Sequence, residues 1–423
     1  MSHQRKLHAH EASRRGKPDQ IETDIAQRIG ALLLKKDRDA RFDLRVAGSW
    51  DHGPQLDLGG EISRHLLTDD LHREIAHLVA ENLGEVEREF GRVALFQRYN
   101  PQAHSLAANG HAGDSGIPIA VAYGNAPFFL PIERLVAVDL RNLFDNDIGY
   151  ERERRSGTLA FAKYFDIPSE FSEYRRQFSG LLSDGKVDVR ATYAGPELIG
   201  IHKIVVALQH APGLPLRALR EEGARWVTAY LEILSDLAGR DVGTPEIIVN
   251  GAGDWHVGGW RTPDAGNREA KPYSNVFGSY GCLEDAIGGE DPSKPSGTGA
   301  FAARWIAVQA VAAGIAPYVE VRLEYDIGSS SVGVNITSHG DREEQKKLER
   351  FVESLRIDLR IPALIERFNL RDPDLYEVTA NGADFFHNPN LPWNKVDRRF
   401  GTGYKPPEEQ TIGSSRRSFG GIG

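Results

Sequence analysis

The chain has 423 residues, 40% of them hydrophobic, a formal net charge of −9 and a single cysteine. This acidic balance argues against nucleic-acid binding, and one thiol excludes a disulfide framework and a thiolate metal cluster. No apolar run approaches the roughly 20 residues of a membrane span, and the basic start lacks the apolar core of a secretory signal. We therefore expect a cytoplasmic, soluble protein with a large core.

The first predicted element is an amphipathic helix that follows the sequence Gly-Lys-Pro-Asp at residues 16–19. Pro18 suits the first helical turn, and the carboxylate of Asp19 favours the positive end of the helix dipole. Lys17 opposes that dipole, so we expect a negative group beside it. One face of the helix carries apolar residues at helical spacing, namely Ile21, Ile25, Ile29, Leu32 and Leu33.

Strands and helices alternate along the rest of the chain. The predicted strands cover 41–48, 54–63, 91–99, 186–195, 198–210, 246–253, 318–328 and 332–339. The predicted helices cover 68–82, 219–238, 298–314 and 343–355. This order predicts three α+β units of similar size in one compact body, because no low-complexity linker separates them. Only residues 405–423 have a composition typical of disorder.

Three glycine-rich segments, at 109–116, 250–266 and 277–301, lie between these units. Glycine allows backbone N–H groups to approach an anion closely, and lysines among the glycines add positive charge. None of the segments fits the Walker or the dinucleotide-binding pattern. Each one alone also fits an ordinary surface loop, but together they favour a phosphate-binding site.

A series of stretches, in order, resembles the S-adenosylmethionine synthetase (methionine adenosyltransferase) family. "GKPDQ" (16–20) stands where that family has Gly-His-Pro-Asp-Lys, and "GGEIS" (59–63) matches Gly-Gly-Glu-Ile-Thr. The other matching stretches are "GHAGDSG" (110–116), "VALQH" (206–210), "PDAG" (263–266) with Lys271, the run 288–316 that begins "GGEDPSK", and "LPWNKVD" (391–397). The resemblance runs collinearly from Glu11 to Asp397.

This resemblance implies an α+β fold of three similar α/β-sandwich domains around a pseudo-threefold axis. We place the domains at 11–108, 109–242 and 243–397, followed by a flexible tail at 398–423. It also implies a homodimer, or a dimer of dimers, with active sites between subunits. In the implied reaction the sulfur of methionine attacks C5′ of ATP and expels triphosphate, which is then hydrolysed to phosphate and pyrophosphate. A thioether carries no proton, so catalysis depends on alignment and on cations, including Mg²⁺, that stabilise the leaving group.

The resemblance also assigns roles to individual residues. It makes Lys17, Lys186, Lys271 and Lys294 catalytic, and it places Asp264 and Trp255 with Lys271 and Lys294 at the ATP. It gives Glu61, Asp114 and Tyr99 to the methionine pocket, and Asp19 and Glu11 to Mg²⁺. Ordinary structural roles stay open, because Glu61 and Asp114 also fit as caps of glycine turns and Trp255 also fits a core.

Several positions depart from the family pattern. Lys17 replaces a histidine that donates to the oxygen between adenosine and triphosphate, and Arg45 stands near a glutamate that holds a monovalent cation. The other replacements are Gln20 for lysine, Ala270 for arginine, Glu290 for lysine and Ser296 for a metal-binding aspartate. The gains and losses of charge cancel, which favours a rearranged triphosphate pocket over an abandoned one. We therefore expect activity without K⁺ and one weakened Mg²⁺ site.

Three functions remain open at this point. The first is synthesis of S-adenosylmethionine from ATP and methionine. The second keeps ATP but uses another acceptor, and it is favoured by the altered segment around 116–131 and by Tyr99, which sits near a methionine-contacting glutamine of the family. The third is a non-catalytic nucleotide-binding or regulatory homologue, favoured by the replaced histidine, arginine and aspartate.

Overall fold

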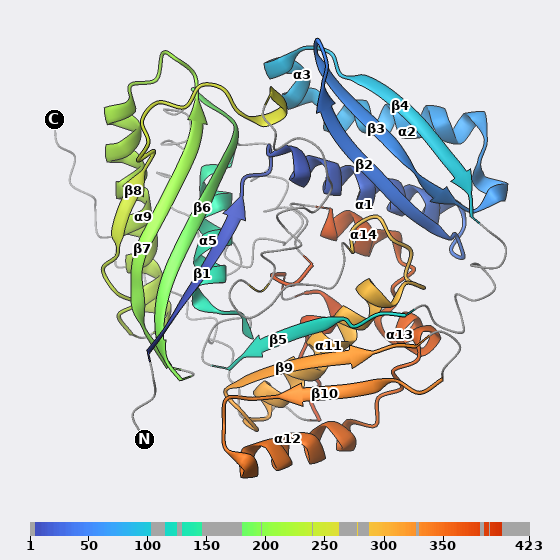
Figure 1. Ribbon diagram of the computed structural model, residues 1–423, viewed down its shortest axis with the longest axis vertical. Helices are drawn as coiled ribbons and strands as arrows, with labels where there is room; N and C mark the ends of the chain where they lie inside the picture. Colours follow the sequence, from blue (N-terminus) through green and yellow to red (C-terminus); the bar gives the residue numbers. More distant parts are fainter. Residues whose placement is uncertain are drawn as a thin grey trace.

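The computed structural model of the chain describes residues 5–102, 115–124, 129–145, 180–195, 197–238, 240–261, 277, 287–326, 330–380, 385–388 and 390–399. These residues form three separate β-sheets (Figure 1). The first has the order β2-β3-β4, with β2 (Phe42–Trp50), β3 (Pro54–Ile62) and β4 (Ala94–Pro101). The second has the order β1-β6-β7-β8, with β1 (Arg5–Ser13), β6 (Leu181–Ala194), β7 (Glu197–His210) and β8 (Glu246–Val249). The third has the order β10-β9-β5, with β5 (Ile119–Tyr123), β9 (Tyr318–Glu324) and β10 (Gly333–Thr337).

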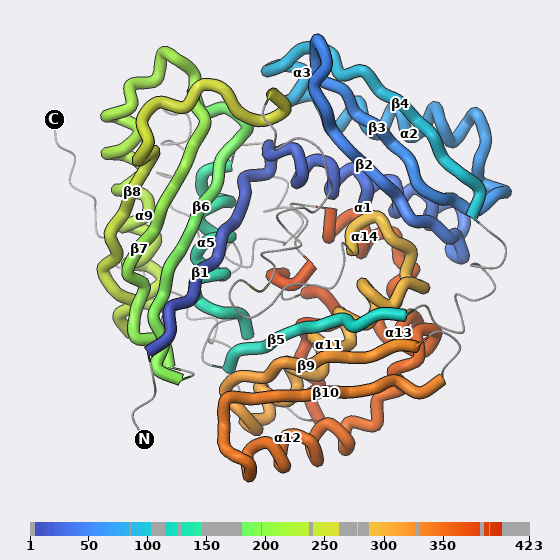
Figure 2. The backbone as a smooth tube through the Cα atoms, in the orientation of Figure 1, coloured from blue at the N-terminus to red at the C-terminus, as the bar shows by residue number. Residues whose placement is uncertain are grey.

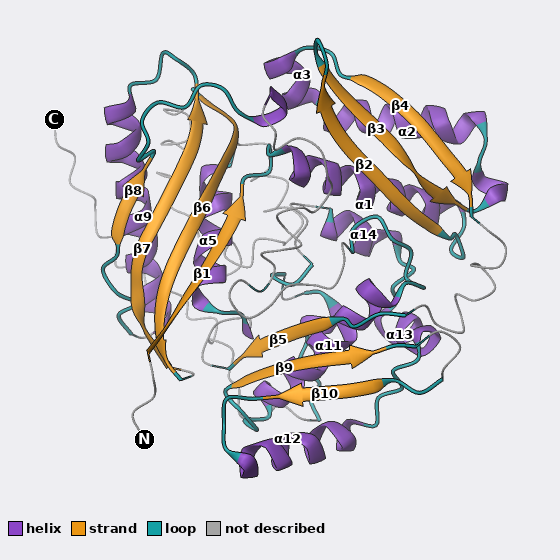
Figure 3. Cartoon of the chain, in the orientation of Figure 1, coloured by secondary structure: helices purple, strands orange, loops and turns teal. Residues whose placement is uncertain are grey.

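One long and largely buried helix packs on each sheet. These helices are α1 (Pro18–Lys36) on β2, α5 (Ile132–Phe144) on β1 and β6, and α11 (Pro295–Ala312) on β5 and β9. Figure 3 shows them nearer the middle of the molecule, with α2 (Asp69–Asn82), α9 (Leu216–Ala238) and α12 (Arg342–Leu355) nearer its rim. Shorter helices are α3 (Gly84–Phe90), α13 (Ile361–Phe368), α14 (Pro373–Thr379) and the 3₁₀ turns Arg64–Leu66, Gly259–Arg261 and Pro392–Asn394.

The predicted α+β fold class is confirmed, and the three sheets surround the middle of the molecule as a pseudo-threefold architecture requires (Figure 1). The predicted first helix and the hairpin β2–β3 are present, and Thr68 caps α2 by accepting from the N–H of Leu71. Within the described ranges, no helix combines the length and the apolar character that crossing a bilayer demands.

The sheets do not follow chain order. The blue β1 pairs antiparallel with the green β6, and the teal β5 pairs antiparallel with the orange β9 (Figure 2). The first sheet is therefore contiguous in sequence, whereas the other two each take a strand from an earlier part of the chain. The domain ranges 11–108, 109–242 and 243–397 remain predictions, and strands are exchanged across them.

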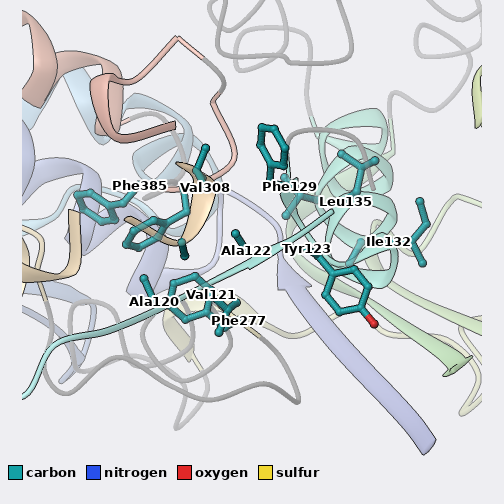
Figure 4. Close-up of a cluster of buried hydrophobic side chains, with 14 of the residues drawn as sticks. Ala120, Val121, Ala122, Tyr123, Phe129, Ile132, Leu135, Phe277, Val308 and Phe385 are labelled. Atoms are coloured by element: carbon teal, nitrogen blue, oxygen red, sulfur yellow. The ribbon is translucent and has the colours of Figure 1, made fainter. Parts of the chain in front are cut away.

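Buried side chains form two clusters that follow this exchange. One cluster belongs to the first sheet and α1, and includes Ile25, Phe42 and Leu58. The other runs continuously through the second and third sheets and their helices. Figure 4 shows a part of this second cluster, where the second and third sheets meet. Residues Ala120 to Tyr123 of β5 lie among Phe129, Ile132 and Leu135 on one side and Phe277, Val308 and Phe385 on the other.

Candidate active site

The predicted residues fall into two groups, each built around a Lys-Pro sequence at the start of a buried helix. Lys17 is the N-cap of α1 and Pro18 follows it, while Lys294 is the N-cap of α11 and Pro295 follows it. Their backbones are alike, with φ, ψ of −68°, 137° at Lys17 and −78°, 128° at Lys294. We call the residues around these starts the α1 cluster (Arg14, Lys17, Asp19, Asp145, Asp184) and the α11 cluster (Asp43, Glu290, Lys294, Ser296).

In the α1 cluster the loop before Lys17 packs tightly against the start of β6. The N–H of Arg14 donates to the carbonyl of Gly185 at 2.8 Å, and a Cβ on Gly16 would lie 2.4 Å from the Ser183 carbonyl oxygen. Glycine is thus required at position 16, because any side chain would collide with backbone. Lys17 and Asp19 are both buried at this junction.

Carboxylates balance the cations of the α1 cluster. Asp145, which follows α5, lies 3.3 Å from Arg14 Nε and 3.6 Å from Arg15 Nε, and its side chain is 4% exposed. Asp145 thus faces the arginines of the loop that leads to Lys17, and a negative group beside Lys17 itself stays a prediction. The sequence did not identify Asp145, because it lies 131 residues from Arg14.

Lys186 and Glu11 form an ion pair beside this cluster. They lie on the paired strands β6 and β1, with Lys186 opposite Ser13, and Lys186 Nζ is 2.7 Å from Glu11 Oε2. Alternation along β6 buries Val187 and leaves Lys186 47% exposed, on the face of the sheet away from the core. Glu11, a predicted Mg²⁺ ligand, is in this structure the partner of a predicted phosphate-binding lysine.

Trp255 lies in the loop between β8 and the turn Gly259–Arg261. Its backbone N–H and carbonyl meet His210 at the end of β7, and its indole N–H donates to the carbonyl of Val257 at 2.6 Å. The ring is partly exposed, whereas Trp260 nearby is 1% exposed and belongs to the first core. The core role left open for Trp255 is therefore filled by Trp260, and Trp255 presents an accessible ring.

In the α11 cluster Lys294 Nζ lies 3.3 Å from Asp43 Oδ2, on β2. Asp43 also forms an isolated bridge with Glu290, and the hydroxyl of Ser296 donates to Glu290 Oε2 at 2.8 Å. Two of the positions that depart from the family pattern, Glu290 and Ser296, therefore touch each other. The carboxylate is present in this cluster, on residue 290 instead of residue 296.

The two clusters lie at different places along α1. The N–H of Gly289, next to Glu290, donates to Oε1 of Gln27 at 2.6 Å. Gln27 is ten residues beyond Lys17, which is about 15 Å of helix. Within one chain, the α11 cluster is thus anchored at the middle of α1 and the α1 cluster at its beginning.

Of the residues predicted for the methionine pocket, the structure describes Glu61 and Tyr99, and these two lie on opposite faces of the first sheet. Glu61 lies opposite Asp43 on the face of the first sheet away from its core, where Arg45 extends over Gly59. Tyr99 lies opposite Gly60 and points to the other face, with its ring 5.6 Å from that of His72 on α2. Burial raises the pKa of the Tyr99 hydroxyl. Asp114, Asp264, Lys271 and the altered Ala270 lie outside the described residues.

The carboxylates of the two clusters and of Glu61 suit Mg²⁺ when phosphate oxygens and water supply the other ligands. Asp19, Asp43, Glu61 and Glu290 offer the hard oxygen ligands that Mg²⁺ prefers. In the ranges that the structure describes, however, no group of three or more His, Cys, Asp or Glu side chains converges as a metal cage. The carboxylates therefore fit the common arrangement in which one or two of them share the ion with phosphate oxygens and water.

Comparison with known proteins agrees with the resemblance seen in the sequence. Residues 257–395 match the family model described as "S-adenosylmethionine synthetase, C-terminal domain". The chain is 26% identical to the S-adenosylmethionine synthase of Clostridium acetobutylicum over 422 residues, which cover 93% of this chain and 98% of the relative. It is also 26% identical to that of Acholeplasma laidlawii over 403 residues (92% and 96%) and to that of Clostridium tetani over 418 residues (93% and 98%).

Proposed function

On the premise that the chain is a divergent member of the S-adenosylmethionine synthetase family, we propose that it transfers the adenosyl group of ATP to methionine. The products are S-adenosylmethionine, phosphate and pyrophosphate. The observation that carries this proposal is the pair of Lys-Pro helix starts: Lys294 lies beside Asp43 on a facing strand, and Lys17 is buried in a loop whose arginines meet Asp145. Such lysines are oriented before a polyphosphate arrives, which is what electrostatic catalysis requires.

The proposed chemistry needs no general base. A lone pair of the methionine sulfur forms the S–C5′ bond while the C5′–O bond breaks, and its electron pair leaves on the triphosphate oxygen. Lys17, Lys186 and Lys294 oppose the charge that develops on that leaving group. An amino group is a stronger base than imidazole, and Lys17 is proposed to supply the positive charge where relatives have imidazole.

Mg²⁺ is the proposed cofactor, held by Asp19 together with phosphate oxygens. When bound, it neutralises charge on the triphosphate and fixes its orientation. Lys271 and Asp264 complete the ATP site in this proposal, with Trp255 stacking on the adenine. Asp114 and Glu61 are proposed to contact methionine.

We propose that the active site is shared between two chains of a cytoplasmic homodimer or dimer of dimers. The 15 Å of helix between the anchors of the two clusters supports this, because one triphosphate does not easily span them within a single chain. A partner related by a twofold axis would bring its α11 cluster to the α1 cluster of the first chain.

A second candidate keeps ATP and changes the acceptor. It is favoured by the placement of Tyr99 and Glu61 on opposite faces of the first sheet, which does not support one methionine pocket formed by both side chains. The proposed reaction differs from this one only in the nucleophile that reaches C5′.

Incubation of the purified protein with ATP and Mg²⁺, with and without methionine, tests the proposal. Methionine-dependent formation of the sulfonium product, with equal amounts of phosphate and pyrophosphate, is the expected result. Triphosphate release that ignores methionine would replace it with the second candidate. Binding of ATP without turnover under either condition would overturn both enzyme functions and leave a nucleotide-binding homologue.

A further inference from the structure

We infer that Glu89 on α3 is a positioning residue for the ATP site. It holds the loop 250–261, which carries Trp255, against the start of β6, which carries Lys186. The inference rests on the proposed function for its catalytic consequence, but its structural part stands on contacts between described residues. Glu89 belongs to the first unit, so the loop is held by an element outside the sheet from which it emerges.

The Glu89 carboxylate accepts from two directions. Its Oε2 accepts from the N–H of Ser183 at 3.2 Å, and its Oε1 accepts from Nε2 of Gln209 at 2.9 Å. Both donors belong to the second sheet, at the start of β6 and the end of β7. Glu89 therefore bridges two neighbouring strands of a sheet to which it does not belong.

Gln209 passes this restraint to Asp184. The Gln209 side chain is 1% exposed, and its Oε1 accepts from the N–H of Asp184 at 3.0 Å. The remaining donor capacity of its Nε2 is used by the carbonyl of His256 at 3.4 Å. Because an amide oxygen and an amide nitrogen face different partners, the side chain has one orientation that satisfies both.

Asp184 in turn holds the loop. Its Oδ2 accepts from the N–H of Gly259 at 2.7 Å and its Oδ1 from the N–H of Gly185 at 2.7 Å. Gly259 adopts φ of 60°, and a Cβ there would lie 2.9 Å from the ring of Phe90, the neighbour of Glu89. Only glycine allows this approach, so the loop is pressed onto α3 and tied to β6 at the same point.

The two predicted ATP contacts in this region are therefore fixed by one network. Lys186 follows Asp184 by two residues on β6, and Trp255 precedes Gly259 by four residues in the loop. Loss of the Glu89 carboxylate removes the acceptor that orients Gln209, and so loosens the contacts of Gln209 with Asp184 and with the His256 carbonyl of the loop. ATP affinity depends on the place of Trp255, which moves with the loop. Departure of the triphosphate depends less on the loop, because Lys186 stays paired with Glu11 on β1.

Swapping the residue types at positions 89 and 209 tests this inference. In Glu89→Gln, one amide hydrogen must face Ser183 N–H or Gln209 Nε2, so one hydrogen bond is lost. In Gln209→Glu, two carboxylates face each other. In the double variant Glu89→Gln with Gln209→Glu, the amide at 89 accepts from Ser183 and donates to the carboxylate at 209, which still accepts from Asp184 but no longer donates to the carbonyl of His256. The matched control is Glu81→Gln, at an exposed position of α2.

Two readouts apply to all four variants and to the unaltered protein. In hydrogen exchange, we expect the amides of 250–261 and 183–185 to exchange at least about tenfold faster in each single variant, which corresponds to one charge-assisted hydrogen bond. The double variant should return to within about twofold of the unaltered protein at 183–185 but recover only in part at 250–261, because the contact with the His256 carbonyl is lost, and the control should match the unaltered protein throughout. In kinetics, the KM for ATP should rise about tenfold in the single variants, while kcat and the KM for methionine change less than about threefold.

The outcomes separate this inference from the proposed function. Unchanged exchange in the single variants, or a double variant no better than either single one, would overturn the positioning role of Glu89. A loss confined to kcat would also overturn it, because positioning of ATP predicts an effect on KM. If the unaltered protein makes no S-adenosylmethionine, the proposed function fails, and the exchange measurement still decides whether Glu89 holds the loop.

Discussion

The starts of α1 and α11 have the same Lys-Pro sequence and nearly the same backbone angles, but their surroundings differ. Lys17 is 6% exposed and lies in a loop whose arginines meet Asp145. The Lys294 side chain is 26% exposed and meets Asp43 on a facing strand, near Glu290. A lysine at the positive end of a helix is unfavourable by itself, and each start compensates with carboxylates from elements distant in sequence. Both helix starts therefore keep a lysine whose positive charge the helix dipole alone disfavours.

The largest predicted effect is the loss of kcat when either of the two helix-start lysines is removed. Lys17→Ala and Lys294→Ala should each lower kcat by about 10²–10³-fold, because each removes an oriented positive charge from the leaving triphosphate. Steady-state rates of S-adenosylmethionine formation measure this, with Lys346→Ala on the exposed side of α12 as the control. A change in KM alone for either lysine would assign it to substrate binding instead.

The next effect is on the free energy of unfolding and concerns the α11 cluster, which contains the pair Glu290 and Ser296. Ser296→Asp should lower the free energy of unfolding by about 1–3 kcal/mol, because it replaces a donor to Glu290 with a second carboxylate. The double variant Glu290→Lys with Ser296→Asp restores an opposite pair and should recover most of that loss. Urea unfolding of the single and double variants measures the coupling. Equal losses in both variants would show that residues 290 and 296 do not compensate for each other.

A pH effect is expected beside the second sheet, where Tyr193 contacts both His8 on β1 and Glu133 on α5. On the buried side of β1, burial and then the charges of Lys6 and His339 lower the pKa of His8 to about 4. His8 packs edge-on against Tyr193, whose hydroxyl donates to Glu133 at 2.6 Å, and burial raises the pKa of the Glu133 carboxyl to about 7. The stabilisation from neutral His8 is lost as pH falls from about 6.5 towards 4, whereas that from protonated Glu133 is lost as pH rises from about 4.5 towards 7.

These two slopes oppose each other between pH 4.5 and 6.5, and removing one group exposes the other. In Glu133→Gln the free energy of unfolding should rise with pH across this range, and in His8→Gln it should fall with pH. Chemical unfolding at a series of pH values measures both slopes. The same slope in both variants would contradict the assignment, and His72→Gln on α2 provides the control.

The smallest effect concerns monovalent cations. Arg45 extends over Gly59 on the same face of the first sheet as Asp43 and Glu61. Its fixed positive charge leaves little need for a cation there, so replacing K⁺ with a bulky organic cation should change kcat less than about twofold. Arg45→Glu should create a dependence on K⁺. Strong activation of the unaltered protein by K⁺ would contradict this role of Arg45.

The sequence predicted what depends on local pattern. The apolar spacing from Ile21 to Leu33 and the proline at position 18 predicted α1, and alternation predicted β2, β3, β6 and β7. The family resemblance, and with it the α+β fold, followed from short stretches in the correct order.

What the sequence did not predict depends on distant pairing. β1 was missed because its buried side chains are His8, His10 and Ala12, which do not resemble an apolar strand, and only its pairing with β6 makes it one. α5 was missed although Arg134 and Arg141 recur at helical spacing, and the structure buries even these charged residues. Glu89 lies 94 residues from Ser183 and 120 from Gln209, so no local signal connects them.

Subunit complementation tests the central claim most directly, namely that the α1 and α11 clusters act on one triphosphate from two chains. Lys17→Ala and Lys294→Ala are each inactive by our account. After unfolding and refolding together, mixed dimers contain one site with both substitutions and one site with neither. The account predicts that the mixture regains about a quarter of the unaltered activity per dimer, since half of the dimers are mixed and each has one intact site. No regained activity, with mixed dimers confirmed by mass, would contradict it.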